Sequence, residues 1–493
     1  MMTYQTIQDF INLAIENGTI DALDEIYWRN QLLQCVGLSD WAEVDTQSHE
    51  KDSLVLMDEL MALAAKNGKI EAGNEEFFES ALMDFITPKP SQINKTFWTN
   101  YEQSPELATA SFYKLAKQIN QVKTRDIAKN IAFEHETNYG NLEITINLSK
   151  PEKDPKLIAA AKLVKATNYP ACQLCIENEG YYGHANHPAR SNHRIIKCEL
   201  NGEKWGFQYS PYAYFNEHSI LLNEVHQPME INGRAFANLL AFLDKFPHYM
   251  IGSNADLPIV GGSILTHDHY QAGNHAFPMA KAGLKKEVTL AHYPKIKAGI
   301  VNWPMSVLRL QSTDKASILE AATDILAKWK LYSDKSLDIK AVSADGTPHH
   351  TITPIARMHD GQYEMDLVLR DNNVSSEFPD GIFHPHQKLH HIKKENIGLI
   401  EVMGLAILPP RLKTELREVE KYLLDEQNQM AEMHKPWADQ LKSTGHFTSE
   451  NVEEQVRQAV GNVFKEVLED AGVFKTDATG QAGFDRFVAF LNE

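Results

Sequence analysis

The 493-residue sequence has few cysteines, no long apolar run and too few basic residues to balance its acidic ones. Four cysteines in a chain of this length do not make a disulfide framework like those of small secreted domains. The longest apolar stretch, residues 397–408, is interrupted by Glu401 and is shorter than the roughly 20 residues of a membrane helix. Neither a disulfide-stabilised fold nor a membrane partner is therefore expected.

The charge balance is strongly acidic: Lys and Arg number 48, Asp and Glu number 66, and the net charge is −18. Nucleic-acid-binding domains are more often basic, so no nucleic-acid partner is expected. An anionic ligand would need a local basic pocket that opposes the overall field. Residues 1–18 lack a basic segment and contain Asp9 and Glu16, which argues against a signal peptide and makes the cytoplasm the expected location.

The composition, 43% apolar and 23% charged, is that of a globular protein, and the length suggests about three domains. Helical spacing of apolar residues predicts helices in the first 85 residues, with stops at Asn17-Gly18 and Asn67-Gly68. A further helix is expected over residues 108–136. From residue 139 the pattern changes to alternating strands and helices, and it becomes helical again after residue 410. The fold class predicted is α+β between helical flanks.

The middle of the chain carries the clearest short elements. Strands are predicted at residues 142–150, 193–200, 204–211 and 218–224, and helices at residues 157–166 and 233–246. Residues 287–410 repeat the alternation of strand and helix. The boundaries predicted from these changes of pattern are 1–138, 139–290, 291–410 and 411–493.

The segment GGSILTHDHYQAGNH, residues 261–275, is the densest in polar chemistry. In an extended segment His267 and His269 would point to the same face, about 6.5 Å apart along the chain. Gly261 and Gly262 would let backbone approach a ligand closely. From spacing alone, two partly exposed surface histidines explain the pattern equally well.

A CxxC pair, Cys172 and Cys175, follows Pro170. Such a turn can place two sulfurs on one tetrahedral zinc, but it is half a site, and without a second CxxC the remaining ligands would be His or carboxylate. A redox pair would need a thioredoxin-like context, and Pro188 argues against a long helix here. Two buried thiols without a metal are the third interpretation.

Other histidines and basic residues offer weaker signals. His218 stands alone before a strand-like run, where a structural role is the commoner one. His384 and His386 form a second HxH, followed by His390 and His391, and four histidines in eight positions favour a metal. Two HxH elements in two similar stretches suggest a duplicated half. Lys and Arg in residues 146–156 and 189–200 are candidate phosphate contacts or an ordinary charged surface.

Three segments, residues 170–196, 214–229 and 261–275, together resemble the galactose-1-phosphate uridylyltransferase family in its Gram-positive-type branch. The resemblance covers nearly the whole chain, and the order CxxC, lone His, HxHxQ is specific. It implies two histidine-triad-like halves with antiparallel sheets, residues 139–290 and 291–410. The first of these halves would be catalytic, and helices would flank the pair.

The resemblance also implies roles for individual residues. His269 matches the family's nucleophile and Gln271 its neighbouring Gln. Asn254 and Ser263 are the nearest matches to phosphate contacts, and Gly261 and Gly262 would admit the pyrophosphate. The zinc ligands implied are Cys172, Cys175, His218 and His267, and a second metal ion, iron or zinc, would bind His384 and His386. No organic cofactor is implied. Asp268 and Tyr270 replace the Pro and Gly of the better-known branch.

The implied reaction moves UMP from UDP-glucose to galactose 1-phosphate through a uridylyl-histidine, giving glucose 1-phosphate and UDP-galactose. The implied partners are UDP-glucose, a hexose 1-phosphate and a second copy of the chain in a homodimer. One alternative is a nucleotidyl hydrolase or phosphorylase of the same fold, using the same His269 with another acceptor. Gln271 favours the transferase. The remote alternative is a non-catalytic, metal-stabilised binding protein.

Overall fold

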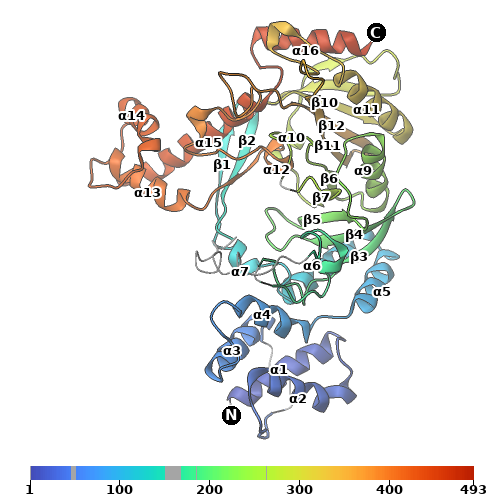
Figure 1. The fold of residues 1–493 in the computed structure, drawn as a ribbon, viewed down its shortest axis with the longest axis vertical. Helices are drawn as coiled ribbons and strands as arrows, with labels where there is room; N and C mark the ends of the chain where they lie inside the picture. The colour runs from blue at the N-terminus through green and yellow to red at the C-terminus, as the bar shows by residue number, and fades with distance from the viewer. Residues whose placement is uncertain (1, 46–50, 150–167, 185, 263) are drawn as a thin grey trace. The chain divides into compact units, whose positions relative to one another are not determined.

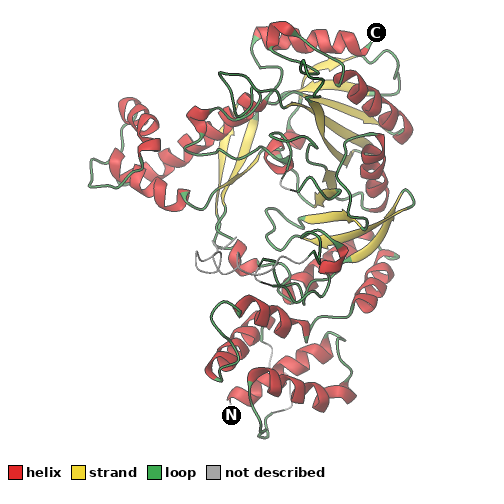
Figure 2. Ribbon diagram, in the orientation of Figure 1, coloured by secondary structure: helices red, strands yellow, loops and turns green. Residues whose placement is uncertain are grey.

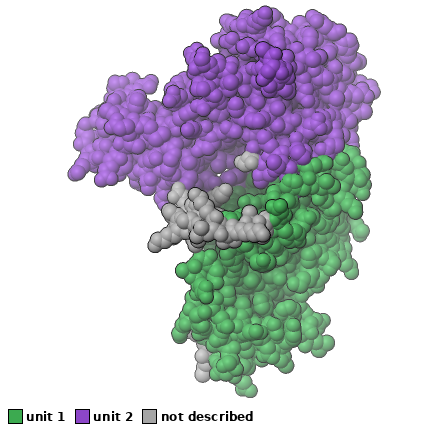
Figure 3. Space-filling view, viewed as in Figure 1, with its two compact units in different colours: residues 1–125, 150–213, 217–227 green, residues 126–149, 214–216, 228–493 purple. Residues whose placement is uncertain are grey.

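The computed structural model describes residues 2–45, 51–149, 168–184, 186–262 and 264–493 (Figures 1 and 2). The chain divides into two compact units (Figure 3). Unit 1 comprises Met1–Arg125, Lys150–Ala213 and Glu217–Gln227, and unit 2 comprises Asp126–Ser149, Tyr214–Asn216 and Pro228–Glu493. The predicted helix over residues 157–166 and the candidate Ser263 lie outside the described residues. The four-part division made from the sequence stays a prediction.

Unit 1 begins with helices: α1 (Met2–Glu16), α2 (Glu25–Val36), α3 (Ser53–Lys66), α4 (Glu75–Asp84), α5 (Pro90–Tyr101) and α6 (Pro105–Gln118). The two predicted helix stops are confirmed, because α1 and α3 each run into an Asn-Gly pair. Gly18 and Gly68 there have φ of 67° and 69°, a left-handed conformation that glycine adopts without a Cβ penalty. Phe10 and Leu60 are among the residues that form a core between these helices.

The strands of unit 1 are β3 (Ile196–Leu200), β4 (Glu203–Tyr209) and β5 (Ser219–Asn223), and each pairs antiparallel with the next. They confirm three of the strands predicted from the sequence. Phe207 and Tyr209 of β4 pack on Phe112 of α6, with ring centroids 6.0 and 5.0 Å apart. This sheet is thereby fixed to the helical part of the unit.

Unit 2 contains a small sheet of β1 (Ile131–Thr137), β2 (Gly140–Ile146) and β13 (Leu405–Leu408). The prediction of a helix from residue 108 to 136 was therefore wrong beyond Gln118, apart from the short α7 (Thr124–Ile127). Residues 131–137 alternate in burial and pair antiparallel with β2. The buried ring of His135 is held by Gln458 and Asn462, at 2.6 and 3.0 Å. In residues 131–137 the alternation of buried and exposed side chains and the contacts with distant residues favour a strand over a helix.

The main sheet of unit 2 runs in the order β7 (His269–Gly273), β6 (Met250–Gly252), β11 (His350–His359), β12 (Gln362–Asp371), β10 (Val307–Ser312), β9 (Lys297–Val301) and β8 (Leu284–Val288). Neighbouring strands in this order are antiparallel. Helices α9 (Gly233–Lys245) and α11 (Lys315–Trp329) pack on it (Figure 1). The predicted helix over residues 233–246 and the predicted α+β class are confirmed.

The remaining helices are α10 (Pro278–Lys281), α12 (Leu399–Val402), α13 (Leu412–Leu423), α14 (Lys435–Thr444), α15 (Val452–Ala471) and α16 (Ala478–Leu491). Single 3₁₀ turns lie at Ala22–Asp24, Ile176–Asn178, Lys335–Leu337, Gln387–Leu389 and Glu432–His434. The helical character predicted after residue 410 is confirmed. Among the described residues, no helix combines the length and the apolar composition that crossing a membrane requires.

Candidate active site and metal-ligand cluster

The ring of His269 is held in one orientation at the start of β7. Its Nδ1 lies 2.7 Å from the backbone carbonyl oxygen of His267. Because a carbonyl can only accept, Nδ1 carries the proton, and in the neutral ring the lone pair is on Nε2. Burial lowers the pKa of His269, which favours the neutral imidazole at pH 7. The residue therefore has the tautomer and the charge of a nitrogen nucleophile.

Side chains alternate along β7, and the alternation sorts the HxHxQ motif into two faces. His269 and Gln271 share one face, and Gln271 pairs with Gly252 of β6. The intervening residues face α9: the Asp268 carboxylate accepts from Arg234 at 2.6 Å, and the Tyr270 hydroxyl accepts from Asn238 at 3.3 Å. The two departures from the better-known motif thus have partners on α9.

Asn254 is fixed beside two glycines that precede the motif. Its Oδ1 accepts from the backbone N–H of Leu399 at 2.8 Å, so its Nδ2 is the remaining donor. A Cβ at Gly262 would stand 2.4 Å from that Nδ2, and a Cβ at Gly261 would stand 2.5 Å from the carbonyl oxygen of Leu257. Only glycine fits at these two positions with Asn254 in place.

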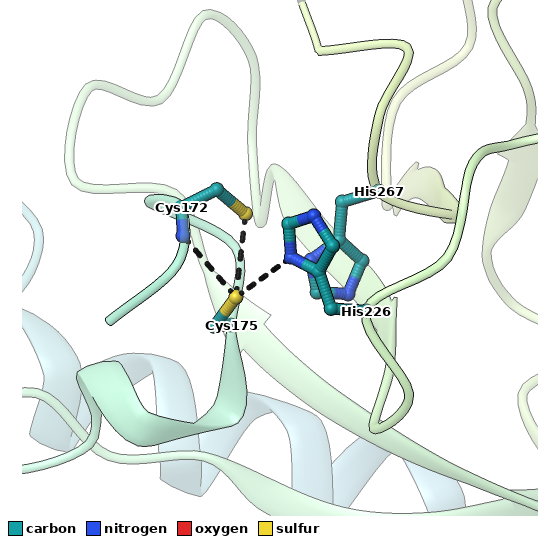
Figure 4. Close-up of side chains that lie close together, drawn as sticks. All are labelled: Cys172, Cys175, His226 and His267. Carbon is teal, nitrogen blue, oxygen red and sulfur yellow. Dashed lines mark hydrogen bonds between the residues drawn. The ribbon is translucent and has the colours of Figure 1, made fainter. Parts of the chain in front are cut away.

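Two thiols and two imidazoles form a compact group of ligand atoms (Figure 4). The Cys175 Sγ lies 3.5 Å from the Cys172 Sγ and 3.1 Å from the His226 Nδ1. The ligand atoms of these three residues and of His267 all lie within 4.8 Å of one another. Two ligands of a tetrahedral zinc with bonds of about 2.3 Å are ~3.8 Å apart, so the spacing and the N₂S₂ donor set both fit zinc.

Burial and backbone hydrogen bonds act in opposite directions on the charge of the cysteines. Burial raises the pKa of the Cys175 thiol to about 12, so a bound cation is what would hold it as a thiolate. The backbone N–H of Cys172 donates to the Cys175 sulfur, and that of Leu174 donates to the Cys172 sulfur, each at 3.3 Å. Donors aimed at sulfur stabilise negative charge on it.

The ligand group contains His226 and not His218, the residue that the family resemblance implies. The two histidines flank β5, one before it and one after it, and the motif order CxxC, His, HxH accepts either. His218 is buried, and its carbonyl oxygen accepts from the backbone N–H of Ser210 at 2.9 Å. His226 follows the strand and reaches Cys175. Which of the two histidines reaches the cysteines depends on the path of the chain after β5.

His384 and His386 have hydrogen-bonding and stacking partners of their own. The two nitrogens of His386 contact the Asp470 carboxylate at 3.2 Å and the Ile382 carbonyl oxygen at 3.0 Å, and its ring stacks on Phe378. The Nε2 of His384 lies 3.3 Å from Asn396. Among the residues that the structure describes, the cysteine group alone brings three or more metal-capable side chains together. The second metal ion at His384 and His386 stays a prediction from the family resemblance.

The basic residues considered as phosphate contacts lie in different environments. Arg194 is buried in unit 1, where it pairs with Asp84 at 2.5 Å and donates to the Pro88 carbonyl at 2.7 Å, which is a structural role. Lys197 is exposed and lies 3.6 Å from Glu224. The lysines at 150, 153 and 156 lie outside the described residues.

Comparisons with family profiles and with known proteins assign nearly the whole chain to one family. Residues 18–228 match the family profile "Galactose-1-phosphate uridyl transferase, N-terminal domain", and residues 242–439 match the corresponding C-terminal domain. The chain is 69% identical over 492 residues to a galactose-1-phosphate uridylyltransferase of Lactococcus lactis subsp. lactis, covering 100% of both proteins. It is 56% identical to that of Streptococcus salivarius, covering 100% of this chain and 99% of the relative.

A third relative, from Enterococcus faecalis, is 54% identical over 98% of this chain and 97% of its own. Among solved structures, yeast Ap4A phosphorylase Apa2 matches with 12% identity and a TM-score of 0.34, covering 63% of this chain and 88% of that chain, and this likeness is too low to support an argument. On the profile matches and the full-length identity, the chain belongs to the galactose-1-phosphate uridylyltransferase family.

Proposed function

We propose that the chain transfers UMP from UDP-glucose to galactose 1-phosphate by a ping-pong reaction in which His269 is the nucleophile. Its curated relatives carry the name of this activity over their full length. The single observation that carries the mechanism is the bond between His269 Nδ1 and the His267 carbonyl, which leaves Nε2 as the attacking atom.

In the first half of the reaction, the Nε2 lone pair attacks the α-phosphorus of UDP-glucose. The bond from that phosphorus to the bridging oxygen breaks, and glucose 1-phosphate leaves with the electron pair. No proton is needed, because the leaving phosphate oxygen is a weak base. The ring then carries positive charge, and the His267 carbonyl that accepts from Nδ1 stabilises it.

In the second half, a phosphate oxygen of galactose 1-phosphate attacks the same phosphorus. The phosphorus–nitrogen bond breaks, its electron pair returns to Nε2, and UDP-galactose leaves. Splitting one displacement into two in this way is the advantage of a covalent intermediate. Gln271 lies on the same strand face as His269, which supports the proposal that its amide donates to a non-bridging phosphoryl oxygen. The Nδ2 of Asn254 is proposed as a second donor to phosphate.

Zinc fits the donor set described above, and we propose that Cys172, Cys175, His226 and His267 hold it. Four protein ligands leave no open position, so the ion would supply structural stabilisation and not Lewis acidity. Fixing the His267 ring also fixes the backbone carbonyl that orients His269. With zinc bound, the ligand residues would thereby help to set the tautomer of the proposed nucleophile.

Two further expectations stay proposals. The four cysteines are all free thiols, which agrees with action in the reducing cytoplasm. A homodimer is proposed from the family resemblance alone, and sedimentation of the purified chain would test it.

The test is to incubate the protein with UDP-glucose alone and to look for a uridylyl adduct by intact-mass and peptide mass spectrometry. We expect one adduct, on the peptide that contains His269, discharged by galactose 1-phosphate. His269→Asn should not form it, whereas His292→Asn, a matched change at an exposed loop residue, should. Steady UMP release without an adduct would instead indicate a hydrolase. Neither adduct nor turnover, in protein that binds UDP-glucose, would favour the binding protein.

A further inference from the structure

Unit 2 contains a cavity of about 350 Å³ that the proposed reaction does not use. It lies beside the first residue of β6, the C-terminal end of β7 and the C-terminal half of β11. Its apolar floor consists of buried residues from several elements, namely Tyr249, Met250, Phe277, Met279, Ile355 and Met403. A volume in this range is typical of small-molecule sites, which run from about 300 to 1,000 Å³.

The floor favours a flat, polarizable ligand. Four methionines contribute to the lining, the fourth being Met358, and two aromatic rings stand among them. Methionine is flexible enough to adapt to a ligand's shape, and its sulfur makes favourable contacts with aromatic rings. An aromatic ring is therefore the group that this floor fits best.

The rim contains five side chains that are able to carry positive charge, in a chain whose net charge is −18. His248, His275, Lys281, Arg357 and His359 contribute to the lining. Some of these have acidic neighbours. Arg357 pairs with Glu364 and with Asp366, the latter at 2.7 Å, His275 lies 2.8 Å from Glu143, and His359 lies 3.6 Å from Asp360.

Lys281, in contrast, is exposed and forms no ion pair within the described part of the chain. It stands at the last residue of α10, and its ammonium is free to pair with a ligand. Lys281 therefore offers a positive charge above an apolar floor, which is complementary to an anion attached to an aromatic ring.

The cavity is separate from the surroundings of His269. Met250 pairs with Gly273 and Gly252 with Gln271, so the cavity begins four residues along β7 from His269, about 13 Å at 3.3 Å per residue. Between the two, Leu399 covers Gly252, where an added Cβ would stand 2.8 Å from the leucine Cδ1. A ligand in the cavity is thus divided from the nucleophile by a side chain.

Helix α12 connects Asn254 with the cavity. Its first residue, Leu399, donates its backbone N–H to Asn254, and Met403, directly after the helix, lines the cavity. The Met403 carbonyl accepts from Met279, another residue of the floor, at 3.1 Å. A displacement of Met403 by a ligand would therefore act on the helix that positions Asn254.

We propose that this cavity is a second ligand site, distinct from that of His269, for a small aromatic anion. The anionic group pairs with Lys281 at the rim, and the ring lies on the methionine floor. The site does not depend on the proposed transferase reaction, because its floor and rim share no residue with the nucleophile or its proposed phosphate donors.

The test uses the full chain and the fluorescent aromatic sulfonate anilinonaphthalenesulfonate. We expect saturable binding of one probe per chain, and saturating UDP-glucose should not displace it. Lys281→Glu should weaken it about tenfold, since it replaces an attraction at the rim with a repulsion. Ala280→Trp should abolish it by filling the cavity, whereas Lys285→Glu, the same charge change at an exposed residue outside the lining, should leave it unchanged.

Three results would overturn the proposal: no saturable binding, displacement of the probe by UDP-glucose, or equal effects of Lys281→Glu and Lys285→Glu. Melting temperatures of the three variants establish that each is folded. Uridylyl transfer is assayed on the same preparations, so that loss of the probe site and loss of the proposed activity are recorded separately.

Discussion

Replacing Gly262 with Ala tests whether Asn254 acts on the substrate. The new Cβ would stand 2.4 Å from Asn254 Nδ2 and 2.5 Å from its Cγ, whereas ordinary contacts begin at 3.4 Å. The amide must therefore move by about 1 Å, and a misplacement of that size near reacting groups can cost about 10²-fold in rate. The same movement strains the bond from the Leu399 N–H to Asn254, worth about 1 kcal/mol of folding stability.

The assay is kcat/KM for the conversion of UDP-glucose and galactose 1-phosphate, together with the melting temperature. Gly283→Ala is the matched control, since nothing lies within 4 Å of the Cβ that it would add. Asn254→Ala should lose activity to a similar degree. The double variant Gly262→Ala, Asn254→Ala should be no worse than either single one, because the two changes remove one interaction. Wild-type kcat/KM in Gly262→Ala, or multiplied losses in the double variant, would refute this reasoning.

Three further predictions concern other parts of the molecule. Gln271→Ala should lower kcat by about 10²–10³-fold while the uridylyl adduct still forms on prolonged incubation, and an adduct formed at the wild-type rate would contradict a donor role. Cys175→Ser should lower the zinc content of the purified protein and its melting temperature, as measured by atomic absorption and calorimetry, whereas Cys35→Ser should leave the zinc content unchanged. Burial lowers the pKa of His193 to about 3, so between pH 6.5 and pH 3 the unfolded chain binds a proton that the folded chain does not. The free energy of unfolding therefore decreases as the pH is lowered through this range. At pH 5 this amounts to about 2 kcal/mol, and His193→Gln, which can still donate to Gln208, should show a smaller drop in melting temperature between pH 7 and pH 5 than the wild type.

Local patterns predicted the elements whose determinants are themselves local. The Asn-Gly pairs end α1 and α3 because glycine accepts the left-handed turn, and that signal lies in two adjacent residues. The face shared by His269 and Gln271 follows from strand alternation alone. Such features need no knowledge of the remaining chain.

Features that depend on distant partners were not accessible in this way. Residues 131–137 form a strand because β2 pairs with them and α15 holds His135, contacts that lie up to 327 positions away. The fourth ligand of the cysteine group depends on the path of the chain after β5, which brings His226 to Cys175. Spacing could identify the types of ligand in that group but not which of two histidines would reach it.

The bond between His269 Nδ1 and the His267 carbonyl would determine the regiochemistry of the proposed covalent adduct. An imidazole can be uridylylated at either nitrogen, which gives two constitutional isomers. Here Nδ1 is occupied as a donor to the His267 backbone oxygen, so in the proposed reaction the phosphorus would join Nε2. A rapidly quenched sample should therefore contain a single isomer after digestion, and comparison with synthetic standards of both would identify it. The isomer formed would thus show which nitrogen of the His269 ring is available for attack in the folded protein.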